Sequence, residues 1–127
     1  HWNNTSGSYN YASGPIVPVN VWSHVALVVT ATNATFYLNG VPTVRTAAHA
    51  AVNFNTAFQL GRDRTNSSRN FIGKMDEVAI YDRALTTNEI REQMHLTKNP
   101  TTDPNLLAYF QIKVSILHLF GGFLWYD

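Results

Sequence analysis

The sequence predicts an all-β fold of antiparallel strands, with one short helix near residues 86–95. Apolar and polar residues alternate along several short segments, and an Asn39-Gly40 pair separates two of these segments. The 127 residues include thirteen Asn and thirteen Thr, and Thr favours strands while Asn favours turns. Only 13% of the residues are charged, about half of the usual ~25%. Uncharged polar side chains must therefore form much of the surface.

The first predicted strands lie on either side of the Asn39-Gly40 pair. Residues 23–31 form one strand, and the side chains expected to face the core are Val25, Leu27, Val29 and Ala31. Residues 35–38 form the next strand. Asn39-Gly40 matches a type I′ hairpin turn, in which both turn residues need a positive φ. Residues 41–46 return as a strand, and Pro42 indicates that it lies near a sheet edge.

The middle of the chain is predicted to be mostly loop, followed by an interrupted strand. A loop of small residues covers 47–55, a short strand 58–60, and a polar loop 62–70. Residues 71–81 read as a strand whose alternation changes phase part-way along. Because side chains alternate with a strict period of two, such a change needs an extra residue. A β-bulge near Asp76-Glu77 is the predicted cause.

The helix is predicted from its capping residues. Thr86 and Glu89 have the spacing of a capping box, in which each side chain bonds an otherwise unpaired backbone N–H group. Leu85 and Ile90 stand at the positions of a hydrophobic staple, which fixes how the chain enters the helix. The helix should therefore begin directly after Thr86.

These segments together resemble a known family. The motifs are Trp22-Ser-His-Val-Ala-Leu-Val28, Phe36-Tyr-Leu-Asn-Gly40, Leu60-Gly-Arg-Asp63 and Gly73-Lys-Met-Asp-Glu-Val-Ala-Ile-Tyr-Asp-Arg-Ala-Leu85. In this order and at these intervals they resemble laminin-G-like domains of the concanavalin A-like lectin/glucanase superfamily. The resemblance covers roughly residues 22–94. It implies an antiparallel β-sandwich of jelly-roll type.

The resemblance also implies that this sandwich is incomplete at its N-terminal side. Only twenty-one residues precede the first motif, where the family has several strands, and the chain begins with His1 rather than Met. We therefore expect a fragment of a longer protein, with the laminin-G-like domain at 1–98. Residues 99–127 are expected to be a linker, a strand resembling the start of a further domain, and an atypical apolar tail. Without upstream strands, residues 106–111 are expected to pair with the open edge of 75–81, within one chain or by strand exchange between copies.

The acidic residues do not form a catalytic set. Related hydrolases place carboxylates at alternate positions of one strand, so that the carboxylates share a face. None of the acidic residues forms such a set: Asp63, Asp76, Glu77, Asp82, Glu89, Glu92, Asp103 and Asp127. The histidines are scattered, and no cysteine is present. The sequence therefore predicts that this chain is not an enzyme.

Calcium is the metal ion that the resemblance implies. Family members hold a structural calcium near the position that matches Asp76, and calcium prefers six to eight oxygen ligands. The alternative is that Asp76 caps backbone N–H groups of the bulge. His24 and His49 lack the spacing of a zinc site.

Two segments are candidates for carbohydrate binding. Aromatic rings stack on sugars while amide and charged side chains bond the hydroxyls. The candidate residues are Trp2, Tyr9, Tyr11, Arg62, Asp63, Arg69 and Asn70. The alternative is that the tyrosines cover the sandwich and the loop is only solvated.

The expected function is a non-catalytic recognition module that binds a glycan or an extracellular protein, within a larger secreted protein. The alternatives are an accessory fragment of a glycoside hydrolase or polysaccharide lyase, and a structural spacer. N-x-Ser/Thr sequons, among them those at Asn3, Asn33 and Asn66, support an extracellular or cell-surface location. The formal net charge of +1 without a basic run disfavours nucleic acid, and the apolar run at 114–126 is too short to span a membrane.

Overall fold

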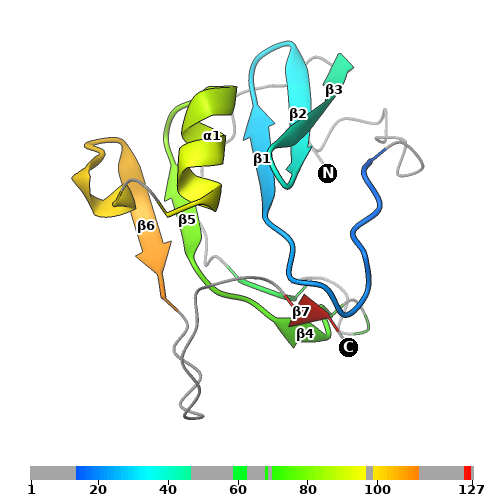
Figure 1. The fold of residues 1–127 in the computed structure, drawn as a ribbon. Coiled ribbons are helices and arrows are strands. Elements are labelled where there is room, and N and C mark those ends of the chain that lie inside the picture. The colour runs from blue at the N-terminus through cyan, green and yellow to red at the C-terminus, as the bar shows by residue number, and fades with distance from the viewer. Residues whose placement is uncertain are drawn as a thin grey trace.

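The computed structural model describes residues 14–46, 59–62, 68, 70–96 and 99–111, and the backbone of residues 125–126. In these ranges the chain forms mostly antiparallel strands, one α-helix and one short 3₁₀ helix (Figure 1). The predicted fold class, antiparallel strands with one short helix, is therefore confirmed.

Three strands that follow one another in sequence form the largest sheet. They are β1 (Val25–Val29), β2 (Asn33–Leu38) and β3 (Val41–Thr46), in the order β1-β2-β3. Asn39 and Gly40 connect β2 to β3 with φ angles of 49° and 75°. Both angles are positive, as the predicted type I′ turn requires. β3 lies at an edge of the described sheet, as Pro42 indicates.

The prediction for the core-facing side of β1 was wrong. β1 is shorter than residues 23–31, and Val25, Leu27 and Val29 are 42%, 44% and 41% exposed. In the register of the sheet Ala26 is opposite Tyr37, so Tyr37 lies on the other face of the sheet from those three side chains. Tyr37 is only 6% exposed. On β1, the side that the pattern assigned to the core is thus the more exposed of the two, although Ala34, opposite Val29 on β2, is buried on that same face.

The interrupted strand at 71–81 forms two strands in two different sheets. β4 (Gly73–Lys74) pairs with β7 (Trp125–Tyr126), and β5 (Val78–Tyr81) pairs with β6 (Leu106–Phe110). The phase change was therefore predicted at the right place, but its cause is a break and not a bulge within one strand. Glu77 lies in the break with a φ of 53°, a left-handed conformation that does not continue a strand.

The pairing of β5 with β6 is antiparallel and confirms the predicted strand at 106–111. Val78 is opposite Phe110 and Ile80 is opposite Ala108, with a register shift after Ile80. The predicted strand at 58–60 is wrong for Gln59 and Leu60, which lie outside any strand, and Phe58 lies outside the described residues.

The helix α1 (Thr87–Met94) begins where the capping box predicts. Thr86 is its N-cap, and both hydrogen bonds of the box with Glu89 are present. The 3₁₀ helix η2 (Pro100–Thr102) follows α1 and leads into β6. Within the described ranges, the structure has no helix that is both long and apolar enough to cross a membrane.

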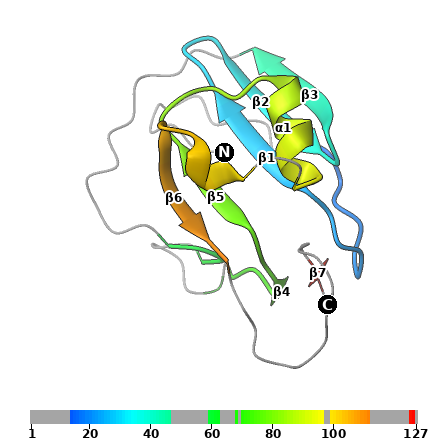
Figure 2. The same ribbon diagram turned by 60° about the vertical axis from the view of Figure 1, so that its left-hand side comes forward.

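α1 lies beside the three-stranded sheet (Figure 1, Figure 2), and the hydrogen bond between Tyr37 and Thr87 places it on the face that carries Tyr37. Tyr37 and Thr87 share a hydrogen bond of 3.1 Å between their hydroxyl oxygens. Arg91 donates from Nε to the carbonyl oxygen of Gly40 at 3.3 Å. A Cβ atom at Gly40 would lie 3.0 Å from Arg91 Cγ, so the absence of a side chain in the turn lets the helix approach.

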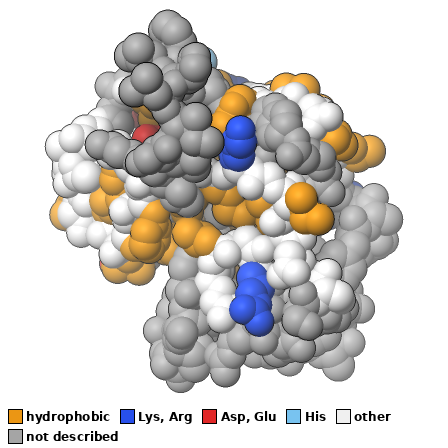
Figure 3. Space-filling model, turned by 90° about the horizontal axis from the view of Figure 1, so that it is seen from below, with side chains coloured by type: hydrophobic (Ala, Val, Ile, Leu, Met, Phe, Trp, Pro, Cys, Tyr) orange, Lys and Arg blue, Asp and Glu red, His pale blue; other side chains and the backbone are white. Residues whose placement is uncertain are grey.

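The buried core in the described part is small. Its buried apolar residues are Ala34, Tyr37 and Ile90. Many other apolar side chains are exposed, and hydrophobic side chains gather on the face seen from below (Figure 3). This arrangement is consistent with a β-sandwich of which the described residues form only a part.

Candidate functional site

The polar loop at 62–70 is closed at its base by a bridge. Arg62 and Asn70 form an isolated antiparallel bridge, and the N–H group of Phe71 donates to the carbonyl oxygen of Gly61 at 2.7 Å. Arg62 and Asn70 are both exposed. Two of the predicted carbohydrate-binding residues are thus held together at the surface. The other predicted residues lie outside the described ranges: Trp2, Tyr9, Tyr11, Asp63 and Arg69.

A glycine next to Arg62 explains how the chain turns at this base. Gly61 has a φ of 68°, which a residue with a side chain rarely adopts. A Cβ atom at this position would lie 3.0 Å from Met75 Cε and 3.7 Å from Phe71 Cβ. The close approach of Met75 links the loop base to the segment just before Asp76.

Asp76 caps the break between β4 and β5. Its Oδ1 atom accepts a hydrogen bond of 2.8 Å from the N–H group of Glu77. This bond supports the left-handed turn at Glu77, because an Asp side chain that bonds a nearby N–H group replaces a missing strand partner. The capping role proposed as the alternative for Asp76 is therefore present.

The carboxylate of Glu77 is the centre of a second polar group. Tyr109 donates its hydroxyl hydrogen to Glu77 Oε2. Gln111 donates from Nε2 to Glu77 Oε1 at 3.3 Å and to the Tyr109 hydroxyl oxygen at 3.2 Å. Burial raises the pKa of Glu77, the neighbouring charge of Asp76 raises it further, and the hydrogen bond from Gln111 partly opposes both effects.

Sequence reasoning did not identify this group, because Glu77 is more than thirty residues away from Tyr109 and Gln111. Tyr109 and Gln111 reach Glu77 only because β6 pairs with β5, with Tyr109 opposite Ala79. The pairing of residues 75–81 with residues 106–111 was predicted, but the register that brings Tyr109 and Gln111 to Glu77 was not. A carboxyl, a phenol and an amide side by side can exchange hydrogen bonds with hydroxyl groups of a ligand.

The described residues do not by themselves make a calcium site at Asp76. No group of three or more His, Cys, Asp or Glu side chains with a geometry suited to a metal ion occurs in the described part. Glu77 is already bonded to Tyr109 and Gln111, and Asp76 to the backbone of Glu77. Calcium needs six to eight oxygens. Most ligands of a calcium ion would have to be carbonyl groups, water, or residues outside the described ranges.

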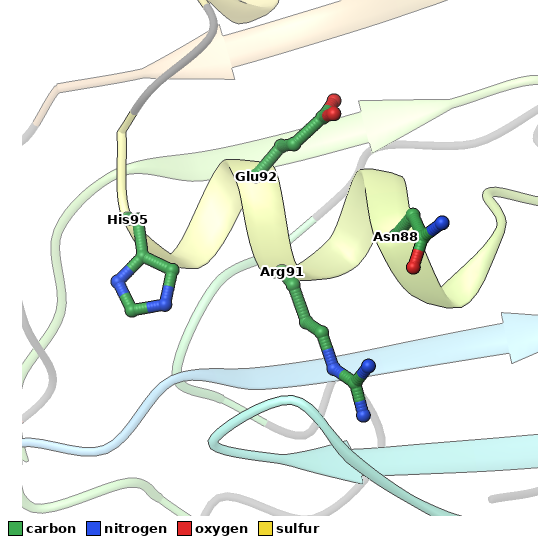
Figure 4. Close-up of a pocket in the computed structure, with 4 residues that line it drawn as sticks. All are labelled: Asn88, Arg91, Glu92 and His95. Carbon is green, nitrogen blue, oxygen red and sulfur yellow. The ribbon is translucent and has the colours of Figure 1, made fainter.

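An open depression of about 290 Å³ lies on α1, and it is lined by Asn88, Arg91, Glu92 and His95. The close-up shows that these side chains do not converge: Arg91 points toward the sheet, while Glu92 points away from it (Figure 4). Arg91 is bonded to the turn at Gly40. The depression therefore reflects how the helix docks and has no convergent set of binding groups.

His24 lies near this helix and stabilises the hairpin. The backbone N–H group of His24 donates to Asn39 Oδ1 at 2.8 Å, and the backbone carbonyl oxygen of His24 accepts from the backbone N–H group of Asn39 at 2.8 Å. The Nδ1 atom is buried and has no hydrogen-bond partner in the described part. Burial lowers the pKa of His24, and the charge of His95 lowers it further. Both effects favour the neutral form of the His24 side chain.

An ion-pair group fixes the connection between β5 and α1. Arg83 donates to Glu89 through Nη1 at 3.1 Å and through Nη2 at 2.7 Å. Its Nη2 atom also donates to Asp103, just after η2. The hydrogen bonds from Arg83, with smaller contributions from Thr86, lower the pKa of Glu89 to about 2. Arg83 thus ties η2, and with it the start of β6, to the first turn of α1.

Comparisons with known proteins agree with this fold. Residues 1–91 match a family model described as the concanavalin A-like lectin/glucanases superfamily. The fold is similar to a crystal structure of an S-layer domain-containing protein from Clostridium thermocellum, with a TM-score of 0.57 and 24% sequence identity. The match covers 65% of this chain and 43% of that chain, so this chain spans less than half of its length. A search of curated proteins gives no match.

Proposed function

Because the chain belongs to the concanavalin A-like lectin/glucanases superfamily, we propose that it is a non-catalytic module that recognises carbohydrate or a surface protein. It acts outside the cell or at the cell surface, as part of a larger secreted protein. The N-x-Ser/Thr sequons support this location. The similar fold of an S-layer domain-containing protein adds support.

The observation that carries the proposal is the bridge between Arg62 and Asn70. The bridge places an arginine and an asparagine directly opposite each other at the base of a polar loop, and both residues are exposed. Loops that join the strands of a rigid scaffold are frequent recognition surfaces. Guanidinium and amide groups donate the hydrogen bonds that sugar hydroxyls and protein carbonyls accept.

Binding of the full chain to a glycan array tests the proposal, followed by calorimetry with any glycan that binds. Arg62→Ala should then weaken binding about tenfold or more, because a lost hydrogen bond to a charged group costs about 1.5–3 kcal/mol. Arg45→Ala, an exposed arginine on β3, is the matched control and should leave affinity unchanged. Equal affinities of the two variants would show that Arg62 does not contribute to glycan binding.

The non-catalytic part of the proposal has its own test. Asp76 and Glu77 are adjacent, and their carboxylates are engaged in the break between β4 and β5. Incubation of the chain with β-glucans, alginate and sulfated glycans should release no reducing ends. Release that disappears in Asp76→Ala or Glu77→Ala would instead favour the accessory fragment of a glycoside hydrolase or polysaccharide lyase.

A structural spacer is the second candidate function. The observation that favours it is the lack of convergent side chains in the depression on α1 (Figure 4). A spacer would bind neither glycans nor surface proteins at micromolar concentrations. The array and a pull-down with the full chain therefore separate the two candidates.

A further inference from the structure

In the described part, the strand β6 pairs with one neighbouring strand. Among the described strands it pairs with β5, and its other contacts fall mainly on η2, which precedes it in sequence. None of the buried residues of the described part lies on β6, and Leu107 and Phe110 are 59% and 41% exposed. β6 is therefore an edge strand that completes a pair but adds little to the core.

In the described part, the hydrogen bonds and ion pairs that hold β6 together with η2 come from residues 77–83, because Asp103, directly after η2, is bonded to Arg83. Glu77 accepts hydrogen bonds from Tyr109 and Gln111. The N–H group of Asp82 donates to the carbonyl oxygen of Asn105 at 3.1 Å. Together with β5, these residues form the edge on which β6 docks. The β6 strand of any copy of the chain can make the same contacts there.

The connection to β6 is long enough to let the strand leave its own domain. Eleven residues separate the end of α1 at Met94 from the start of β6 at Leu106. If η2 and Asp103 move with β6 and keep their contacts, residues 95–99 are the connection that can extend, over roughly 16–18 Å. Leu96 has a φ of 52° just after the helix, a conformation that is unfavourable for a bulky side chain. An extended connection would remove that strain. The chain has no cysteine, so no disulfide holds β6 in place.

We propose that β6 is exchangeable together with β7, which follows it and pairs with β4, and that two copies of the chain associate by each placing these strands on the β5 and β4 edges of the other. Each exchanged copy makes the contacts of the monomer, so the exchange is favoured by concentration and not by new interactions. The partner is therefore a second copy of this chain. This inference does not depend on whether the chain binds a ligand.

Single-cysteine variants test the exchange, because the natural chain contains no other thiol. Ile80 and Ala108 are directly opposite in the β5–β6 pair. Ile80→Cys and Ala108→Cys are mixed, concentrated, and treated with a short bismaleimide cross-linker. The matched control mixes Ala79→Cys with Ala108→Cys, since Ala79 is one residue away from Ile80 in the regular part of the pair and faces the other side of β5. The double variant with both Ile80→Cys and Ala108→Cys shows whether the strands pair within one chain.

The expected result is a cross-linked dimer of Ile80→Cys with Ala108→Cys, several-fold more abundant than in the control mixture and increasing with concentration. The double variant should form an internal cross-link at low concentration. An internal cross-link without a selective mixed dimer would overturn the proposal, because β6 then stays in its own chain. Failure of the double variant to cross-link internally would overturn it too, since β5 and β6 would not be paired.

Discussion

The hydroxyl oxygen of Tyr37 lies 3.1 Å from that of Thr87, and this hydrogen bond joins β2 to the first residue of α1. The two residues are fifty positions apart in sequence. Tyr37 is almost fully buried, so its hydroxyl needs a partner within the protein. The bond therefore fixes where the start of the helix sits on the sheet.

Tyr37→Phe should lower the free energy of unfolding by about 0.5–1.5 kcal/mol, because one buried hydrogen bond is lost. Tyr37→Ala should lower it by about 3–5 kcal/mol, because a cavity is added. Urea unfolding followed by circular dichroism measures both. Thr87→Val completes a double-mutant cycle: if the losses from Tyr37→Phe and Thr87→Val simply add, the two hydroxyl groups do not interact.

Thr86→Ala should destabilise the chain by about 1 kcal/mol, because it removes the N-cap of α1. The Thr86 hydroxyl accepts from the N–H group of Glu89 at 3.3 Å, and the Thr86 N–H group donates to Glu89 at 2.8 Å. Asn88→Ala, at an exposed position of the same helix, is the control and should be neutral or slightly stabilising. Thermal unfolding of both variants checks this. Equal melting temperatures would mean that tertiary contacts alone define the start of the helix.

The features predicted correctly from sequence are those that depend on neighbouring residues. The turn at Asn39-Gly40 and the cap at Thr86 each need only a few adjacent side chains, and both occur as predicted. The break at Glu77 was located because the alternation of apolar residues changes there. Its nature was not predictable, because it depends on β4 and β5 having different partner strands.

The features that were missed depend on which elements meet in space. The alternation of residues along β1 shows that the side with Leu27 is apolar. It does not show that α1 packs on the opposite face, where Tyr37 lies. In the same way, the group of Glu77 and Tyr109 requires the register between two distant strands. Of the predicted binding residues, Arg62 and Asn70 are brought together by the bridge. Their loop was recognisable in the sequence because it is rich in polar residues.

Calcium at Asp76 stays a prediction that thermal unfolding can test. If Asp76 binds a structural ion, calcium at about 100 times its Kd should stabilise the chain by ~2.7 kcal/mol and raise the melting temperature. Asp76→Asn should abolish the increase. Asp82→Asn removes an exposed carboxylate six residues later and should retain it. Identical melting curves in calcium and in chelator would leave Asp76 with its hydrogen bond to Glu77 as its role.

The ion pairs of Arg83 should make stability depend on pH in the acidic range. The pKa of Glu89 is lowered from 4.5 to about 2, and that of Asp103 is also lowered, in both cases mainly by hydrogen bonds from Arg83. Because both groups bind protons more weakly in the folded state, their contribution is complete above about pH 5 and is lost as the pH falls toward 2.

Arg83→Gln should therefore be less stable than the natural chain near neutral pH, and the difference should shrink as the pH falls from about 5 to about 2. Urea unfolding at a series of pH values measures it. Other groups that titrate in this range contribute equally to both proteins and cancel in the difference. A difference that stays constant over the whole range would show that Arg83 acts by packing and not through its charge.

The open apolar face of β1 should tolerate polar substitution better than the core. Leu27 is 44% exposed and Ile90 only 3%. Full burial of such side chains contributes about 1.5–3 kcal/mol, so Leu27→Thr should cost roughly 1 kcal/mol, whereas Ile90→Thr should cost about 2–5 kcal/mol.

The triple variant Val25→Thr, Leu27→Thr, Val29→Thr should also bind less of a hydrophobic dye such as ANS. Val44→Thr, an exposed valine on the opposite face of the sheet, is the matched control and should change dye binding less. If Leu27→Thr instead destabilises the chain as much as Ile90→Thr, this face is covered in solution, and Leu27 belongs to a core.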